Sequence, residues 1–240
     1  MKPENYEKIP GSANIAQIIH GTKAEGPGIR TAIWFQGCSI LCKNCCNPSF
    51  LPFKDNKWMT HVEIMDSIVE YNKNNPDEKV EGVTFIGGEP FDQPISLSTL
   101  TFYAKSLGLT VMIFTGNLIE DLKAKNDPFI NTILNNTDIL VDGKYDDTKR
   151  TNKIRWVGST NQRMHFLTNA YTESDPQFKE ENTVEYRLVK GELIVNGWPI
   201  NSNKSPLISA EDLKRKQSIS EKVYPLFLLQ SFISRILFYI

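Results

Sequence analysis

Hydrophobic residues in the first two thirds of the chain come in short runs, separated by polar and glycine-rich stretches. Four of these runs are rich in β-branched and aromatic residues and are too short for helices, so we predict strands. Between them, apolar residues recur at helical spacing. The predicted strands are 30–37, 83–86, 109–114 and 139–141. The predicted helices are about 60–72, 97–107 and 117–123.

Local signals set the ends of two predicted helices. Thr60 followed by Glu63 has the spacing of a capping box, and Gly108 is well placed to end the second helix. The alternation of strand and helix predicts parallel β/α units, whose chemistry collects where the strands end. The unusual motifs of this chain stand directly after predicted strands, so we expect them to meet at one edge of a sheet.

The pattern changes beyond Tyr171. Two apolar runs at 184–188 and 192–195 predict a C-terminal hairpin. A polar linker and an apolar tail with helical spacing follow it. We therefore predict one domain over residues 1–200 and a helical C-terminal extension over residues 201–240.

Composition and charge narrow the class of protein. The chain has 240 residues, of which 40% are hydrophobic, enough for a real core. Its net charge of -1 argues against a main function in binding nucleic-acid phosphates or anionic membranes. No run reaches the roughly 18 apolar residues of a transmembrane helix, and the polar N-terminus lacks the apolar core of a signal peptide. We expect no transmembrane span and a cytoplasmic protein.

All four cysteines fall within nine residues. Such clustering cannot join distant loops by disulfides, so it indicates a metal or cofactor site. The spacing Cys38-x3-Cys42-x2-Cys45 supplies three thiolates, which would leave one iron of a four-iron cubane without a protein ligand. An open iron is what a catalytic cluster needs. We expect Cys46 to be a buried thiol, or one beside the cluster, rather than a ligand.

Zinc is the alternative for this cysteine loop. A structural zinc site takes four ligands, and His20 or His61 would have to complete it. The protein would then be a zinc-binding module without redox chemistry. The spacing of the three cysteines matches a cluster better than it matches the paired cysteines of zinc sites.

The cysteine motif and several others resemble, in order, those of the radical S-adenosylmethionine (SAM) activating enzymes, in particular those that serve anaerobic ribonucleotide reductase. The resemblance covers roughly residues 15–170. The motifs are Gly26-Pro27-Gly28-Ile29-Arg30, the cysteine loop with Gly37, Gly87-Gly88-Glu89-Pro90, Phe114-Thr115-Gly116, Val141-Asp142-Gly143-Lys144 and the block 155–162. By residue type alone, Arg30 would be a surface or ion-pair residue.

The resemblance implies an α/β fold, a partial (β/α) barrel of the radical SAM type with the C-terminal hairpin and helical tail added. It implies that Cys38, Cys42 and Cys45 hold a 4Fe–4S cluster and that SAM chelates the open iron. The residues that it places against SAM are Asn44, Cys46, Gly87, Gly88, Glu89 and Thr115.

The implied activity is reductive cleavage of SAM to a 5′-deoxyadenosyl radical, with an electron from a flavodoxin- or ferredoxin-type donor. The radical would install a glycyl radical on a partner enzyme such as anaerobic ribonucleotide reductase. A radical SAM enzyme that acts directly on a small molecule, similar to 7-carboxy-7-deazaguanine synthase, is the alternative within the same chemistry.

Overall fold

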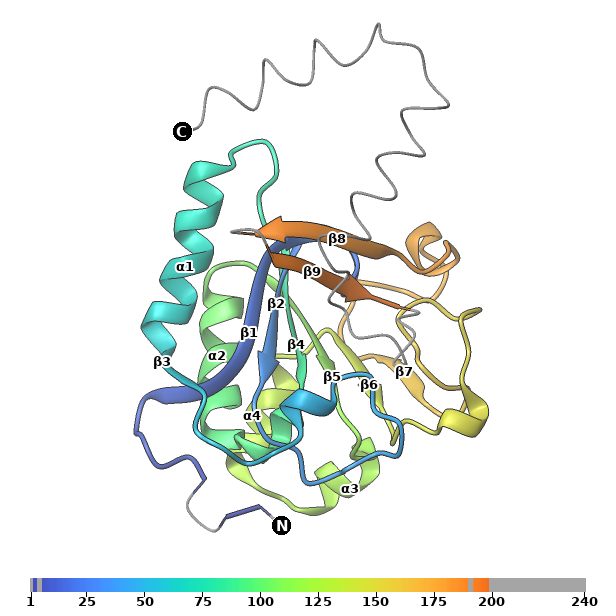
Figure 1. The fold of residues 1–240 in the computed structure, drawn as a ribbon, viewed down its shortest axis with the longest axis horizontal. Coiled ribbons are helices and arrows are strands. Elements are labelled where there is room, and N and C mark those ends of the chain that lie inside the picture. Colours follow the sequence, from blue (N-terminus) through green and yellow to red (C-terminus); the bar gives the residue numbers. More distant parts are fainter. Residues whose placement is uncertain (1, 4–5, 190–191, 199–240) are drawn as a thin grey trace, which may run out of the picture. The chain divides into compact units, whose positions relative to one another are not determined.

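The computed structural model describes residues 2–3, 6–189 and 192–198 (Figure 1). The chain divides into two compact units. The larger holds the described residues up to Glu185 together with Asn196–Trp198, and the smaller holds Tyr186–Val189 and residues 192–195. The predicted helical extension over 201–240 lies outside the described residues, and the division at residue 200 stays a prediction.

A seven-stranded mixed sheet forms the centre of the larger unit (Figure 1). Its four central strands are parallel to one another, which confirms the predicted β/α units. Three further strands, β1, β3 and β7, pair antiparallel with their neighbours and were not predicted. In spatial order the strands are β3 (Lys57–Thr60), β1 (Ser12–Thr22), β2 (Arg30–Phe35), β4 (Gly82–Gly87), β5 (Thr110–Phe114), β6 (Ile139–Asp142) and β7 (Arg163–Phe166).

The sheet has two free edges within the described part of the chain. Strand β3 is at one end and β7 at the other, and the sheet does not close on itself. The architecture is therefore mixed α/β with a parallel-rich sheet. The finer prediction of a partial barrel is not confirmed by this topology.

The helices are α1 (His61–Asn74), α2 (Pro94–Ser106), α3 (Ile119–Ala124) and α4 (Pro128–Asn135). The first three confirm the predicted helices, and α1 begins with the predicted capping box of Thr60 and Glu63. Helix α4 was missed, although Asp127 caps it and Pro128 occupies its first turn. Among the residues with a described structure, no helix is both long enough and apolar enough to cross a bilayer.

The predicted C-terminal hairpin is confirmed. Strand β8 (Val184–Val189) pairs with β9 (Glu192–Gly197) in a separate two-stranded sheet.

The two faces of the large sheet are packed differently. Helices α1, α2 and α4 cover one face, where their apolar residues pack on side chains such as Phe35, Phe85 and Ile113. A smaller apolar cluster lies on the other face and includes Met112, Val141 and Trp156. Alternate residues of a strand point to opposite faces, so β5 and β6 contribute to both clusters.

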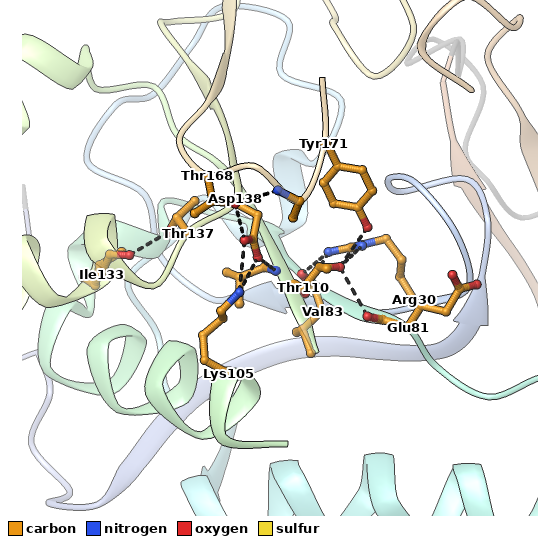
Figure 2. Close-up of polar contacts among 12 residues, drawn as sticks. Arg30, Glu81, Val83, Lys105, Thr110, Ile133, Thr137, Asp138, Thr168 and Tyr171 are labelled. Carbon is orange, nitrogen blue, oxygen red and sulfur yellow. Dashed lines mark hydrogen bonds and ion pairs between the residues drawn. The ribbon is translucent and has the colours of Figure 1, made fainter. Parts of the chain in front are cut away.

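Arg30 is buried among the first residues of the parallel strands, so its expected surface or ion-pair position is wrong. The residue is 0% exposed, and no carboxylate of the described residues pairs with its guanidinium group. Instead it donates five hydrogen bonds: Nε to the Thr84 hydroxyl at 2.8 Å, Nη1 to Pro27 O and Thr110 Oγ1, and Nη2 to Val83 O and Thr110 O. Tyr171 completes this network by a hydrogen bond with Thr110 (Figure 2).

Replacing Arg30 tests how much the start of the sheet depends on this network. We expect Arg30→Met to lower the free energy of unfolding by about 3 kcal/mol, because three carbonyls and two hydroxyls lose their buried donors. Urea unfolding measures the change. Lys123→Met, which removes an exposed charge from α3, is the control and should change the stability by less than about 0.5 kcal/mol. Equal effects of the two substitutions would contradict the assignment.

Candidate active site

Backbone hydrogen bonds between the β2 and β4 segments continue past the last residues of the two strands. Gly88 donates its N–H to Phe35 O at 2.8 Å, and Glu89 donates to Gly37 O at 2.9 Å. The Gly87-Gly88-Glu89 turn therefore lies directly beside the residue that precedes Cys38. The sequence motifs that follow two different strands are brought together, as the parallel order predicts.

Close backbone approach explains the two glycines of this turn. A Cβ on Gly88 would lie 2.1 Å from the carbonyl oxygen of Gly37, and one on Gly87 would lie 2.6 Å from Phe35 N. Gly87 also has a φ of +110°, which side chains rarely tolerate. The pair is thus required by the contact between the two strand ends, whatever ligand lies beside it.

Glu89 connects this turn to the end of β5. Its carboxylate accepts hydrogen bonds from the Thr115 hydroxyl at 2.8 Å, Gly116 N at 2.9 Å and Phe91 N at 2.9 Å. The side chain is only 2% exposed. Burial raises the pKa of Glu89 to about 7, although these three donors favour the ionised form. The structure therefore brings Glu89 and Thr115 together through a direct bond, and their predicted contacts with SAM stay predictions.

The cysteine loop is anchored at both ends. Gly37 N donates to Phe50 O at 2.8 Å, and Cys38 N donates to Leu51 O at 3.0 Å. Asp92, which follows the β4 turn, accepts from both the backbone N–H and the hydroxyl of Ser39. Sequence reasoning missed Asp92, whose only signal is its position three residues after Glu89.

Two residues of the loop adopt left-handed backbone conformations, and each directly precedes a predicted cluster ligand. Leu41 has a φ of 51° before Cys42, and Asn44 has a φ of 55° before Cys45. Asparagine tolerates this conformation better than most residues, which gives a local reason for its presence at position 44. Its side chain points away from the loop, to Asp147, with a hydrogen bond of 2.8 Å.

The three predicted ligand thiols each accept backbone N–H groups. Cys38 accepts from Ile40 and Leu41, and Cys42 accepts from Tyr145. Cys45 Sγ accepts from Asn47 N at 3.4 Å. Such bonds are typical of sulfur ligands of iron–sulfur clusters. Three sulfurs with these donors, on one anchored loop, fit the protein side of a 4Fe–4S site.

The thiols differ in their environments. Burial raises the pKa of Cys38 to about 12 and also raises that of Cys42. The pKa of Cys45 is lowered to about 7, first by a hydrogen bond with the Cys46 thiol. That same bond raises the pKa of Cys46, and the negative charge of Glu25 adds to the effect. Cys46 is exposed, so the expectation that it is buried is wrong.

The described residues form no group of three or more cysteine, histidine or acidic side chains arranged to hold a metal ion. The two histidines considered for zinc have other surroundings. His20 hydrogen-bonds Thr31 and stacks on Tyr71, while His61 is buried at the start of α1. The ligand assignments to Cys38, Cys42 and Cys45 therefore stay predictions.

A second segment, residues 145–147, borders the cysteine loop and was missed by the sequence reasoning. Tyr145 donates its backbone N–H to Cys42, and its hydroxyl donates to Asp147 at 2.9 Å. Asp147 in turn accepts from Asn44. These residues follow the Val141–Lys144 motif, but a single sequence gives no sign that they reach the cysteines.

Comparison with known proteins identifies the family. The family described as "4Fe-4S single cluster domain" matches residues 24–165, more than half of the chain, and the chain belongs to this family. The match favours the iron–sulfur interpretation of the cysteine loop over zinc. It begins just before the Gly26–Arg30 motif and ends within β7, so it covers the strand ends described above.

Two curated relatives and one solved structure are similar. The anaerobic ribonucleoside-triphosphate reductase-activating protein of Enterobacteria phage T4 is 27% identical over 62% of this chain and 92% of its own length. The pyruvate formate-lyase-activating enzyme of Clostridium pasteurianum is 36% identical over 41% of this chain, which spans 43% of that enzyme. QueE from Escherichia coli has a TM-score of 0.35 at 20% identity, covering 48% of this chain and 58% of QueE, too slight to support any argument.

The Glu89 carboxylate makes stability depend on pH in a defined direction. The folded state keeps a proton on Glu89 up to about pH 7, while the unfolded chain releases it near 4.5. The folded state therefore binds more protons between these values, and this group's contribution to stability falls as pH rises through that window.

We expect Glu89→Gln to remove that pH dependence. Urea unfolding at pH 4.5 and pH 7.5 should show the wild type losing up to about 3 kcal/mol relative to the variant. Glu70→Gln, an exposed position on α1, is the control and should follow the wild type at both pH values. Parallel pH profiles for the wild type and Glu89→Gln would disprove the raised pKa.

Proposed function

We propose that this chain is a radical SAM activating enzyme, which cleaves SAM reductively at a 4Fe–4S cluster and installs a glycyl radical on a partner enzyme. The observation that carries the proposal is the anchored cysteine loop. It starts at the end of β2, where hydrogen bonds from Gly88 and Glu89 hold the β4 turn beside it. The family match and the functions of the two relatives support the same activity.

The cluster ligands in this proposal are Cys38, Cys42 and Cys45. When bound, the cluster supplies the electron that splits SAM into methionine and a 5′-deoxyadenosyl radical. The chain's own contribution is position. Ser39 and Asp92 hold the start of the loop, and the N–H donors on the three sulfurs stabilise their thiolate form.

The contacts to SAM that we propose come from both sides of the loop. Gly87, Gly88, Glu89 and Thr115 lie on the strand-end side, where Glu89 joins β4 to β5. Asn44 and Cys46 flank Cys45 on the other side. Close packing of the glycines against β2 supports this assignment, because it keeps the backbone near the first cysteine.

The proposal also specifies the type of barrel, the partner, the electron donor and the location. The four central parallel strands support a partial-barrel arrangement of the radical SAM type. The partner is an anaerobic ribonucleotide reductase, since the phage T4 relative is matched over 92% of its length. A flavodoxin- or ferredoxin-type protein supplies the electron. The location is the cytoplasm, where a reducing environment keeps thiols available.

Cysteine substitutions test the cluster assignment. We expect anaerobically reconstituted wild type to hold about four iron and four sulfide per chain and, with dithionite and SAM, to release 5′-deoxyadenosine. Cys38→Ala, Cys42→Ala and Cys45→Ala should each abolish this release, because each removes a ligand. Cys46→Ala is the matched control and should keep the cluster, because Cys46 is not a ligand in this proposal. Loss of the cluster in Cys46→Ala with retention in Cys45→Ala would reverse the assignment.

The partner is tested separately. Incubation of the reconstituted protein with SAM, a reductant and the anaerobic ribonucleotide reductase of the same genome should give the electron paramagnetic resonance doublet of a glycyl radical on the reductase. Replacement of the reductase's radical glycine by alanine is the control. Release of 5′-deoxyadenosine without a radical on the reductase would exclude this partner but would still support the proposed cleavage of SAM.

A further inference from the structure

The end of β9 crosses between two loops of the larger unit. Asn196 donates its amide to Thr22 Oγ1 at 2.9 Å, and Gly197 N donates to Glu25 Oε1 at 2.8 Å. On the other side, the Trp198 indole donates to Thr151 O at 2.6 Å, and its ring centroid lies 5.9 Å from that of Tyr145. We call Thr22, Glu25, Tyr145 and Thr151 the seat of this segment.

Glu25 is the most unusual part of the seat. Its carboxylate is buried, and among the described residues no lysine or arginine pairs with it. Its hydrogen-bond donors are Gly197 and Asn196, both from the seated segment. A buried carboxylate without a donor is costly, so Glu25 needs either this segment or another donor in the same place. A peptide N–H from another chain would provide one.

The seat borders the cysteine loop. The ring of Tyr145 packs on Trp198, while the backbone N–H of the same residue bonds Cys42. Asp147, which accepts from the Tyr145 hydroxyl, also accepts from Asn44. A segment bound at the seat thus contacts Tyr145, which itself contacts the predicted cluster ligand Cys42. A polypeptide bound at the seat would therefore lie beside the cysteine loop.

Position 197 requires glycine because of Thr183 and Ala24 beside it, and the segment leaves one buried polar atom without a described partner. Gly197 has a φ of +100°, and a Cβ there would lie 2.1 Å from Thr183 O and 2.9 Å from Ala24 Cβ. The Trp198 ring lies against Tyr145. The Cζ atom of Arg150 lies over the same ring, 4.5 Å from its centroid. However, Asn196 Oδ1 is buried and has no partner among the described residues, which costs stability.

We propose that Asn196–Trp198 is an intramolecular stand-in for the partner's substrate segment, and that the partner binds by displacing it. The segment that fits has a glycine with a positive φ followed by an aromatic residue. Glu25 accepts the N–H of that glycine, and Tyr145 and Arg150 receive the aromatic ring. This inference rests on the proposed function for the identity of the partner, but the binding itself needs no SAM chemistry.

A peptide copied from this chain is the probe. A fluorescent synthetic peptide of residues 192–198 is titrated into the full-length protein, followed by anisotropy. Wild type should bind it weakly, because its own segment competes at high effective concentration. Trp198→Ala loosens that segment and should bind about tenfold more tightly. Gly108→Ala, another glycine with positive φ but with nothing within 4 Å, is the control and should bind as wild type does.

Three further measurements make the result decisive. Adding Glu25→Ala to Trp198→Ala should abolish the gain, and a peptide with alanine in place of its glycine should bind at least about tenfold less tightly. In unmodified protein, an excess of peptide should accelerate hydrogen exchange of the Gly197 amide. No tighter binding by a folded Trp198→Ala, or no change in that exchange rate at saturating peptide, would overturn the proposal.

The readouts separate this inference from the proposed function. Peptide binding and amide exchange are measured without SAM or an electron donor. If 5′-deoxyadenosine forms normally but the peptide does not bind the seat, only the stand-in is disproved. If the peptide binds as expected but SAM is not cleaved, only the radical SAM activity is disproved.

Discussion

The structure depends first on the contact between the ends of β2 and β4. Two hydrogen bonds continue the parallel pairing past the strands, so the backbone at Gly88 lies against Gly37 with no room for a side chain. That contact fixes where the cysteine loop starts. Glu89, the next residue, extends it to the end of β5 through its buried carboxylate. Three strand ends are thereby held as one unit beneath the cysteines.

Buried charge is satisfied by neutral partners at both ends of the parallel strands. At their start, no carboxylate among the described residues pairs with Arg30, which is held by five hydrogen bonds to carbonyls and hydroxyls. At their carboxyl ends, Glu89 is held by N–H and hydroxyl donors, and burial moves its pKa to about 7. Neutral partners satisfy both groups, so each depends on backbone geometry and not on a mobile counter-charge.

The predicted site combines strand ends and a loop that are firmly joined with a segment of the same chain, Asn196–Trp198, that lies beside them. Backbone hydrogen bonds and close glycine contacts join the strand ends to the anchored cysteine loop. Asn196–Trp198 is held by hydrogen bonds to Thr22, Glu25 and Thr151, yet it leaves a buried amide oxygen without a described partner. This contrast is suited to a protein that must keep a reactive centre in place and still admit a polypeptide.

Local patterns in the sequence determined much of this molecule. The central strands, the first three helices, the capping box at Thr60 and the hairpin follow from periodicity and turn chemistry, which act over a few residues. The cysteine spacing indicated an iron–sulfur site for the same reason, since one loop carries the whole motif. Parallel order then predicted that the Gly87–Glu89 turn would meet that loop.

Only the tertiary structure decided what depends on residues far apart in the chain. The antiparallel strands β1, β3 and β7 gain their stability from neighbours, so their own sequences carry weak signals. By residue type Arg30 is expected at the surface, and only the fold shows that Thr84 and Thr110 surround it. The pairing of Glu89 with Thr115, and of Glu25 with Gly197, likewise joins segments that no local pattern connects. Such contacts arise from packing, where burial and hydrogen bonding are settled for the whole chain at once.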